Sequence, residues 1–173
     1  NVSYNPDSEL IPISRSNGVL LALSVPRSGL VSGMSSLMML DGWTWEDATL
    51  KNPVGLHIFW PSMNLPKQIS GKKKDKNEKD MRLQSIQKID DLFHESHAYL
   101  KLKDSGSSSF KHDLRLEGMI SVITGDIPVF IHANEVRQIE AAVYWADRQN
   151  LPMVLVGGKD SWRVTELLKE RDI

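Results

Sequence analysis

The sequence predicts an α/β domain built from parallel β/α units, and two observations indicate this class. Short apolar runs without the polar alternation of a half-exposed strand occur at residues 19–25, 54–60, 128–132 and 152–156. Such runs are typical of strands that are buried on both faces, as in parallel sheets. A helical pattern separates the last two runs, and a crossover of this kind makes consecutive strands parallel. We therefore expect all four strands to share one parallel sheet.

Helices are predicted where apolar residues recur at three- and four-residue steps. The pattern is clearest over residues 135–150, where Asn134 is expected to be the N-cap. The apolar stripe of this helix consists of Val136, Ile139, Ala142, Val143 and Ala146. Similar patterns predict a long helix over residues 81–100, a shorter one over 113–123, and a last one after Ser161. The serine-rich residues 105–109 are expected to separate the helix over residues 81–100 from the helix over 113–123.

Residues 1–173 are expected to form a single domain with one charged surface excursion at residues 71–80. Acidic residues interrupt the lysines there, which favours a solvated loop leading into a helix over a nucleic-acid patch. The whole chain carries 21 Lys and Arg against 22 Asp and Glu, so no overall field attracts nucleic acid or an anionic membrane. The expected partner is a small molecule. A cytoplasmic and a periplasmic location both stay open.

The absence of cysteine excludes disulfides, thiolate metal sites and cysteine nucleophiles. Among the histidines, His132 is the strongest candidate because it ends an apolar run just before a helix, at the sheet edge where α/β folds bind ligands. A histidine hydrogen-bonded at the sheet margin is the equally weighted alternative. His57 lies inside its strand, where a buried structural role is favoured over a ligand role.

Other candidate sites are weaker. His94 and His97 could bind a metal on one helix, but they do not form the His-Glu-x-x-His arrangement, and a solvated helix face is favoured. His112 carries no pattern. Residues 29–36 offer glycines and hydroxyls to an anion but lack a P-loop lysine, so a simple turn is favoured. At residues 157–159 an anion site and a solvent-facing loop weigh equally.

Several segments together resemble a branch of the amidohydrolase superfamily close to imidazolonepropionase and related cyclic-amide hydrolases. They are residues 28–47, which include Leu40-Asp41-Gly42-Trp43, together with residues 53–57, 116–117, 127–134 and 155–158. The resemblance implies a (β/α)8 TIM barrel with a small β-sandwich. It also implies one or two divalent metals, zinc being expected, that activate a water for attack on a carbon–nitrogen bond.

Within this resemblance, His132 matches a metal ligand. The family's His-x-His occurs nowhere in the chain, its late catalytic aspartate would lie beyond Ile173, and Val156-Gly157-Gly158 stands where many members have a histidine. Both ends of the sequence look cut, so we expect a fragment, a partial barrel from a parent that hydrolyses non-peptide carbon–nitrogen bonds of a small molecule, cyclic amides included. This chain alone is expected to hold no metal tightly and to be inactive. The alternative is a non-catalytic α/β module that holds an anionic small molecule at the sheet edge.

Overall fold

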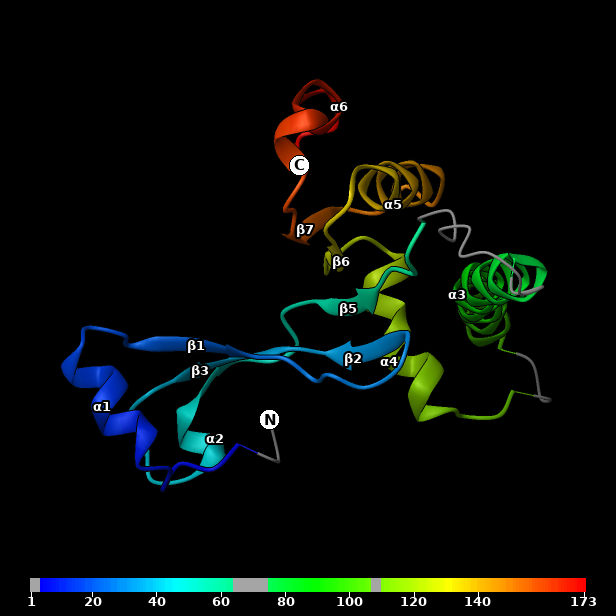
Figure 1. Cartoon of the computed structure of the whole chain (residues 1–173). Helices are drawn as coiled ribbons and strands as arrows, with labels where there is room; N and C mark the ends of the chain where they lie inside the picture. Colours follow the sequence, from blue (N-terminus) through cyan, green and yellow to red (C-terminus); the bar gives the residue numbers. More distant parts are fainter. Residues whose placement is uncertain (1–3, 64–74, 107–109) are drawn as a thin grey trace.

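The computed structural model describes residues 4–63, 75–106 and 110–173 and contains two sheets (Figure 1). The smaller sheet is antiparallel, with the order β1 (Leu21–Ser24), β3 (Ser36–Met39), β4 (Thr49–Lys51). Helices α1 (Leu10–Ser16) and α2 (Trp45–Ala48) lie beside it (Figure 1). The larger sheet has the order β2 (Val31–Met34), β5 (Leu56–Phe59), β6 (Val129–Ala133), β7 (Met153–Gly157).

The larger sheet confirms the mixed α/β class with parallel strands. Strands β5, β6 and β7 run parallel, while β2 pairs antiparallel with β5. The prediction that residues 19–25 join this sheet was wrong, because β1 pairs with β3 instead. Leu21 of β1 is 47% exposed, so its apolar run does not report burial on both faces. The place beside β5 is taken by β2, which the sequence pattern did not indicate as a strand.

The helices of the larger layer are α3 (Asp75–Asp104), α4 (Leu114–Ile123), α5 (Val136–Arg148), the short 3-10 helix η1 (Ser161–Arg163) and α6 (Thr165–Glu170). They confirm the predicted helices over residues 81–100 and 113–123, and Asp113 caps α4 by accepting from the Arg115 N–H at 2.8 Å. Residues 71–74 of the charged segment and residues 107–109 of the serine-rich segment lie outside the described part. No helix in the described part is long and apolar enough to cross a membrane.

The start of α5 differs from the prediction by one residue. Glu135, not Asn134, is the N-cap, and it forms a capping box with Gln138. The Gln138 side chain also accepts from the Asn134 N–H at 2.8 Å and donates to the Trp60 carbonyl oxygen at 2.6 Å. Because one glutamine connects the helix start to the end of β5, it fixes the turn between β6 and α5 relative to the neighbouring strand.

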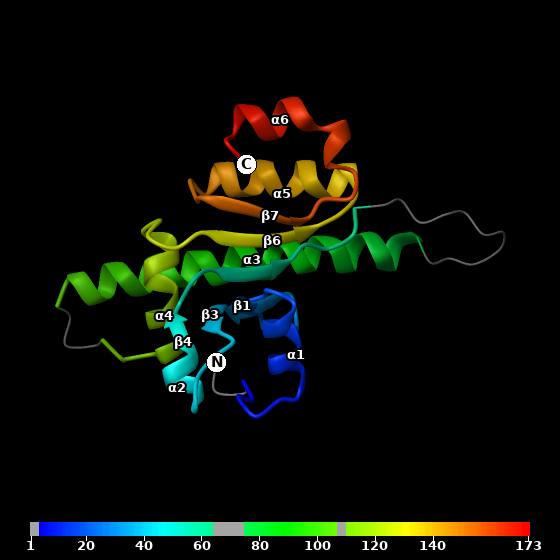
Figure 2. The ribbon, with the colours of Figure 1, turned by 90° about the vertical axis from the view of Figure 1, so that its left-hand side faces the viewer.

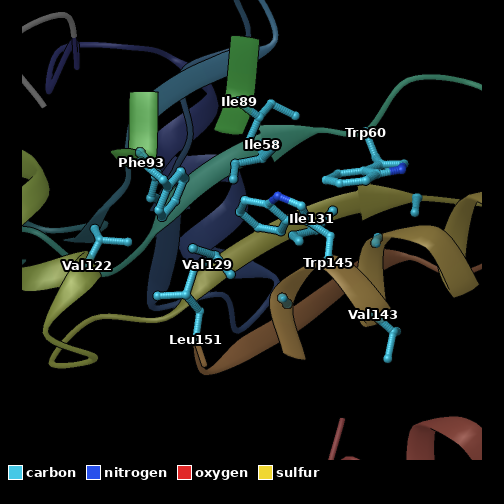
Figure 3. Close-up of a cluster of buried hydrophobic side chains, with 14 of the residues drawn as sticks. Ile58, Trp60, Ile89, Phe93, Val122, Val129, Ile131, Val143, Trp145 and Leu151 are labelled. Atoms are coloured by element: carbon cyan, nitrogen blue, oxygen red, sulfur yellow. The ribbon is translucent and has the colours of Figure 1, made fainter. Parts of the chain in front are cut away.

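One face of the larger sheet forms the core with the helices. In Figure 2, β5, β6 and β7 face the viewer, and α3, α4 and α5 lie behind them. The core side chains from β5 and β6 pack against Ile89 and Phe93 of α3 and Trp145 of α5 (Figure 3). The indole N–H of Trp145 donates to Asp90 at 2.7 Å, which connects α5 to α3 through a partly buried polar contact.

The opposite face of the sheet, here called the open face, carries the alternate side chains of β5, β6 and β7. They are His57, Phe59, Phe130, His132, Val154 and Val156. None of them belongs to the core cluster, and apart from buried His57 they are half-buried or exposed. Side chains of adjacent strand residues point to opposite faces, so the sheet has one packed face and one apolar face that is only partly covered.

Candidate functional site

The parallel pairing of β5 and β6 brings two histidines together on the open face. His57 pairs with Phe130, and Phe59 pairs with His132, so the two imidazoles lie diagonally across neighbouring strands. Nδ1 of His57 and Nε2 of His132 are 2.9 Å apart, which is a hydrogen-bond distance. Since a neutral imidazole has one N–H and one lone pair, either ring could donate and the other accept.

Two aromatic rings fix the planes of these imidazoles. Phe130 stacks on His57 with ring centroids 4.8 Å apart and planes at 19°. Phe59 stacks on His132 with centroids 4.0 Å apart and planes at 13°. Each imidazole therefore has a fixed face and a fixed nitrogen partner, and fixed orientation is what a ligand or a proton-transfer group requires.

Burial keeps both histidines neutral near neutral pH. Burial lowers the pKa of His57 from 6.5 to about 4, and the neighbouring His132 adds to the effect. The pKa of His132 is also lowered, first by burial and then by the positive charge of Arg27. Neutral imidazole is the form that binds metals and accepts protons, so the pair is available for either role without losing a proton first.

One atom of this pair is not satisfied. Nε2 of His57 is buried and has no hydrogen-bond partner among the described residues. A buried polar atom without a partner costs roughly 1–3 kcal/mol, so native proteins usually keep one only where it serves a purpose. The side chain for which the sequence favoured a structural role is thus hydrogen-bonded through only one of its two ring nitrogens among the described residues.

Sequence reasoning singled out His132 and gave less weight to His57. The pair could be found from the sequence only if the register of β5 against β6 were known, because the two residues are 75 positions apart. Once the register is given, the signal is simple. Both histidines occupy the same alternate set of strand positions, together with Phe59 and Phe130.

The other histidines lie elsewhere. His94 is exposed and His97 is half-buried on α3, the helix that packs on the opposite face of the sheet. His112 is 3.8 Å from Glu117 at the surface of α4. The described residues contain no group of three or more His, Asp or Glu side chains that could hold a metal ion.

The predicted turn at residues 29–36 is mostly strand. Val31 and Gly33 pair with β5, and the Ser35 N–H donates to the Gly55 carbonyl oxygen at 2.9 Å. These contacts occupy amides that an anion would need. At the other candidate loop, the Gly158 N–H donates to the Ala133 carbonyl oxygen at 2.8 Å, and Lys159 is exposed.

His132 fits as one ligand of a divalent metal. Its ring is half-buried and lies on the open face of the sheet. Of its two ring nitrogens, Nε2 contacts His57. A catalytic zinc usually takes three protein ligands and a water. The described residues would offer such a site one imidazole, and its remaining ligands would have to come from other elements on the open face.

Comparison of the sequence with protein-family models and with curated proteins gives no match. The structure, in contrast, is similar to the crystal structure of an amidohydrolase from Thermotoga maritima MSB8, with a TM-score of 0.81 and 22% sequence identity. The fold is that of part of this amidohydrolase. The similarity covers 98% of this chain and 45% of that one, so the chain spans less than half the length of the protein it matches.

Proposed function

We propose that this chain is part of a metal-dependent amidohydrolase barrel whose parent hydrolyses a non-peptide carbon–nitrogen bond in a small molecule. The observation that carries the proposal is the fixed histidine pair on the open face of a parallel sheet whose fold matches part of an amidohydrolase. Cyclic amides, the substrates of the imidazolonepropionase-like branch, are the substrate class that the sequence resemblance favours.

The partial barrel accounts for the open face. Phe59, Phe130 and Val156 are half-buried there, and Val154 is 39% exposed. In an α/β barrel the helices surround the sheet and the opposite side chains fill the interior, where further strands would cover them. The match to 45% of a larger chain supports the same arrangement, with the additional strands supplied by the parent.

In this proposal His132 holds the metal together with ligands from other strands, and zinc is the expected ion. The bound metal would supply a Lewis acid that lowers the pKa of a water molecule. The chain's own contribution is to present a neutral imidazole that is immobilised among half-buried apolar side chains. The stacked ring of Phe59 prevents His132 from turning away from that position.

Metal content tests this assignment. The isolated chain, dialysed against a weak chelator, should retain far less than one zinc per molecule, because one imidazole is too few for tight binding. In the complete protein, His132→Ala should remove stoichiometric zinc and the hydrolysis of amides, while His94→Ala should change neither. The isolated chain could instead bind stoichiometric zinc and lose it specifically with His132→Ala. That result would mean that these residues complete the site, and it would contradict the proposal that the chain is only part of the barrel.

The alternative of an anion-binding module receives less support. Residues 29–36, one of its two candidate loops, use their backbone in strand pairing. Binding of inorganic phosphate to the isolated chain, lost in Lys159→Ala and kept in His132→Ala, would favour that alternative over the hydrolase.

A further inference from the structure

We propose that His57 is a positioning residue for His132: it accepts the Nε2 hydrogen of His132 and so leaves the Nδ1 lone pair of His132 free to bind a ligand. The inference rests on the proposed function for the nature of that ligand, a divalent metal. The hydrogen bond and the tautomer can be tested without any metal.

The distance between the two nitrogens favours a hydrogen bond over a shared metal. Two imidazoles on one tetrahedral zinc, each at about 2.0–2.1 Å, place their nitrogens roughly 3.3–3.4 Å apart. The observed 2.9 Å between Nδ1 of His57 and Nε2 of His132 is shorter and matches a nitrogen–nitrogen hydrogen bond. The pair is therefore built to share a hydrogen, not to chelate an ion between its members.

The choice of tautomer follows from what each arrangement leaves on His132. If His57 donated from Nδ1, the lone pair on Nε2 of His132 would accept that hydrogen bond. The hydrogen of His132 would then be on Nδ1, and neither of its nitrogens would have a lone pair left for a metal. If His132 donates from Nε2, its Nδ1 lone pair is free. Nε2 of His57, buried without a partner among the described residues, carries a lone pair when His57 donates and a hydrogen when His132 donates. Only the second gives His132 a function as a ligand.

Burial assigns the roles within the pair. His57 is 1% exposed and cannot meet a substrate, whereas His132 is half-buried. A histidine that binds a metal almost always donates its second ring N–H to a neighbouring acceptor, which sets its tautomer and orientation. Nδ1 of His57 is such an acceptor, and the stacked Phe130 keeps the His57 ring in place.

Nuclear magnetic resonance of the intact chain tests the hydrogen bond. With 15N-labelled histidine at about pH 7.5, long-range 1H–15N spectra report which ring nitrogen of each histidine carries hydrogen, and His132→Gln assigns the His132 signals. We expect His132 to be protonated on Nε2 and bare on Nδ1, with a 15N–15N coupling across the bond to Nδ1 of His57. A His132 ring protonated on Nδ1, or a mixture of both forms, would overturn the proposal.

Two substitutions separate positioning from a general effect on the fold. His57→Asn places an acceptor oxygen near the position of Nδ1, whereas His57→Leu removes the acceptor. In a zinc titration that follows the Nδ1 signal of His132, His57→Leu should weaken binding at least about 10-fold and His57→Asn by less than about 3-fold. His94→Gln, on the exposed side of α3, is the matched control and should not change binding. Equal binding by wild type and His57→Leu would overturn the proposal.

The outcomes also separate this inference from the proposed function. If zinc shifts Nδ1 of His57 and Nε2 of His132 together, the pair chelates the ion, so the positioning role fails while metal binding stands. If the tautomer and the coupling are as expected but zinc leaves the Nδ1 signal of His132 unchanged even in the complete protein, the positioning role stands and the metal-dependent hydrolase fails.

Discussion

Gly55 shows how closely the site is packed at the level of single residues. A Cβ atom at this position would lie under 3.0 Å from the ring of Phe130 and 3.0 Å from the Pro128 carbonyl oxygen. Phe130 is the ring that stacks on His57, so the absence of a side chain at Gly55 allows the stack to form. The requirement is one of space, since Gly55 does not adopt a positive φ.

The first prediction is that Gly55→Ala lowers the free energy of unfolding by about 1–3 kcal/mol, the usual cost of overpacking. The methyl group must displace the Phe130 ring, so the 15N signals of His57 should also shift. Urea denaturation measures the stability. Gly118→Ala in α4 is the control: a Cβ there would have nothing within 4 Å, and removing a helical glycine should stabilise by about 0.5–1 kcal/mol. Equal effects of the two substitutions would contradict the packing argument.

At the level of elements, α3 and α4 are joined by a polar contact around Glu117. Its carboxylate accepts from the Tyr99 hydroxyl at 2.8 Å and from the Lys103 ammonium group. The hydrogen bond from Lys103, followed by that from Tyr99, lowers the pKa of Glu117 below its usual value of 4.5. Because the folded pKa is lowered, this carboxylate stabilises the fold above the unfolded pKa, and the contribution is lost as the pH falls through the folded pKa.

We therefore expect Glu117→Gln to lower the thermal midpoint near pH 7 and to lose this effect as the pH falls below about 4. Thermal denaturation of both proteins over this range gives the difference at each pH. Glu95→Gln removes the more exposed ion pair to Arg115 on the same two helices and should lower the midpoint less at neutral pH. A Glu117→Gln deficit that stays constant down to about pH 3 would show that the charge of Glu117 contributes nothing.

The contact between α5 and α3 gives a third prediction. Trp145→Phe keeps an aromatic ring but removes the N–H that donates to Asp90, which should cost about 0.5–1.5 kcal/mol because a half-buried carboxylate loses its shortest hydrogen bond. Trp162→Phe is the matched control, since Trp162 is 71% exposed and its replacement should change stability by less than about 0.5 kcal/mol. Urea denaturation of the two variants should separate them clearly.

On the scale of the whole molecule, the larger sheet has one face that forms a core and one that is open. Val129 is fully buried under the helices, whereas Val154 on the neighbouring strand lies on the open face. A sheet in which one apolar face is only partly covered is expected when further elements of a larger protein complete it. The stability of this chain should therefore depend on one face much more than on the other.

The fourth prediction compares the two faces with the same substitution. Val129→Thr should lower the free energy of unfolding by about 1–3 kcal/mol, because it buries a hydroxyl group among apolar side chains. Val154→Thr should change it by less than about 0.5 kcal/mol, because the hydroxyl group can reach water. Similar losses for both in urea denaturation would mean that the open face is covered in this chain, which would contradict the proposed partial barrel.

Local patterns in the sequence determined much of the helical layer and three of the strands. The three- and four-residue repeat of α5 and the cap at Asp113 depend on neighbours within a turn, so the chain specifies them without tertiary context. The apolar runs of β5, β6 and β7 likewise matched parallel strands. Their expected burial on both faces was wrong for β7, which has no fully buried residue. The candidate ligand His132 followed from its place at the end of such a run.

The tertiary structure decided which strands pair and which side chains meet. An apolar run does not specify its partner, so β1 could join a separate antiparallel sheet while β2 took the place beside β5. His57 lies 75 positions before His132, and only the register of β5 against β6 puts their nitrogens in contact. A shift of one residue in that register would turn one histidine into the core, because successive strand residues point to opposite faces. Packing of the helices on one face fixes the register, and through it the site.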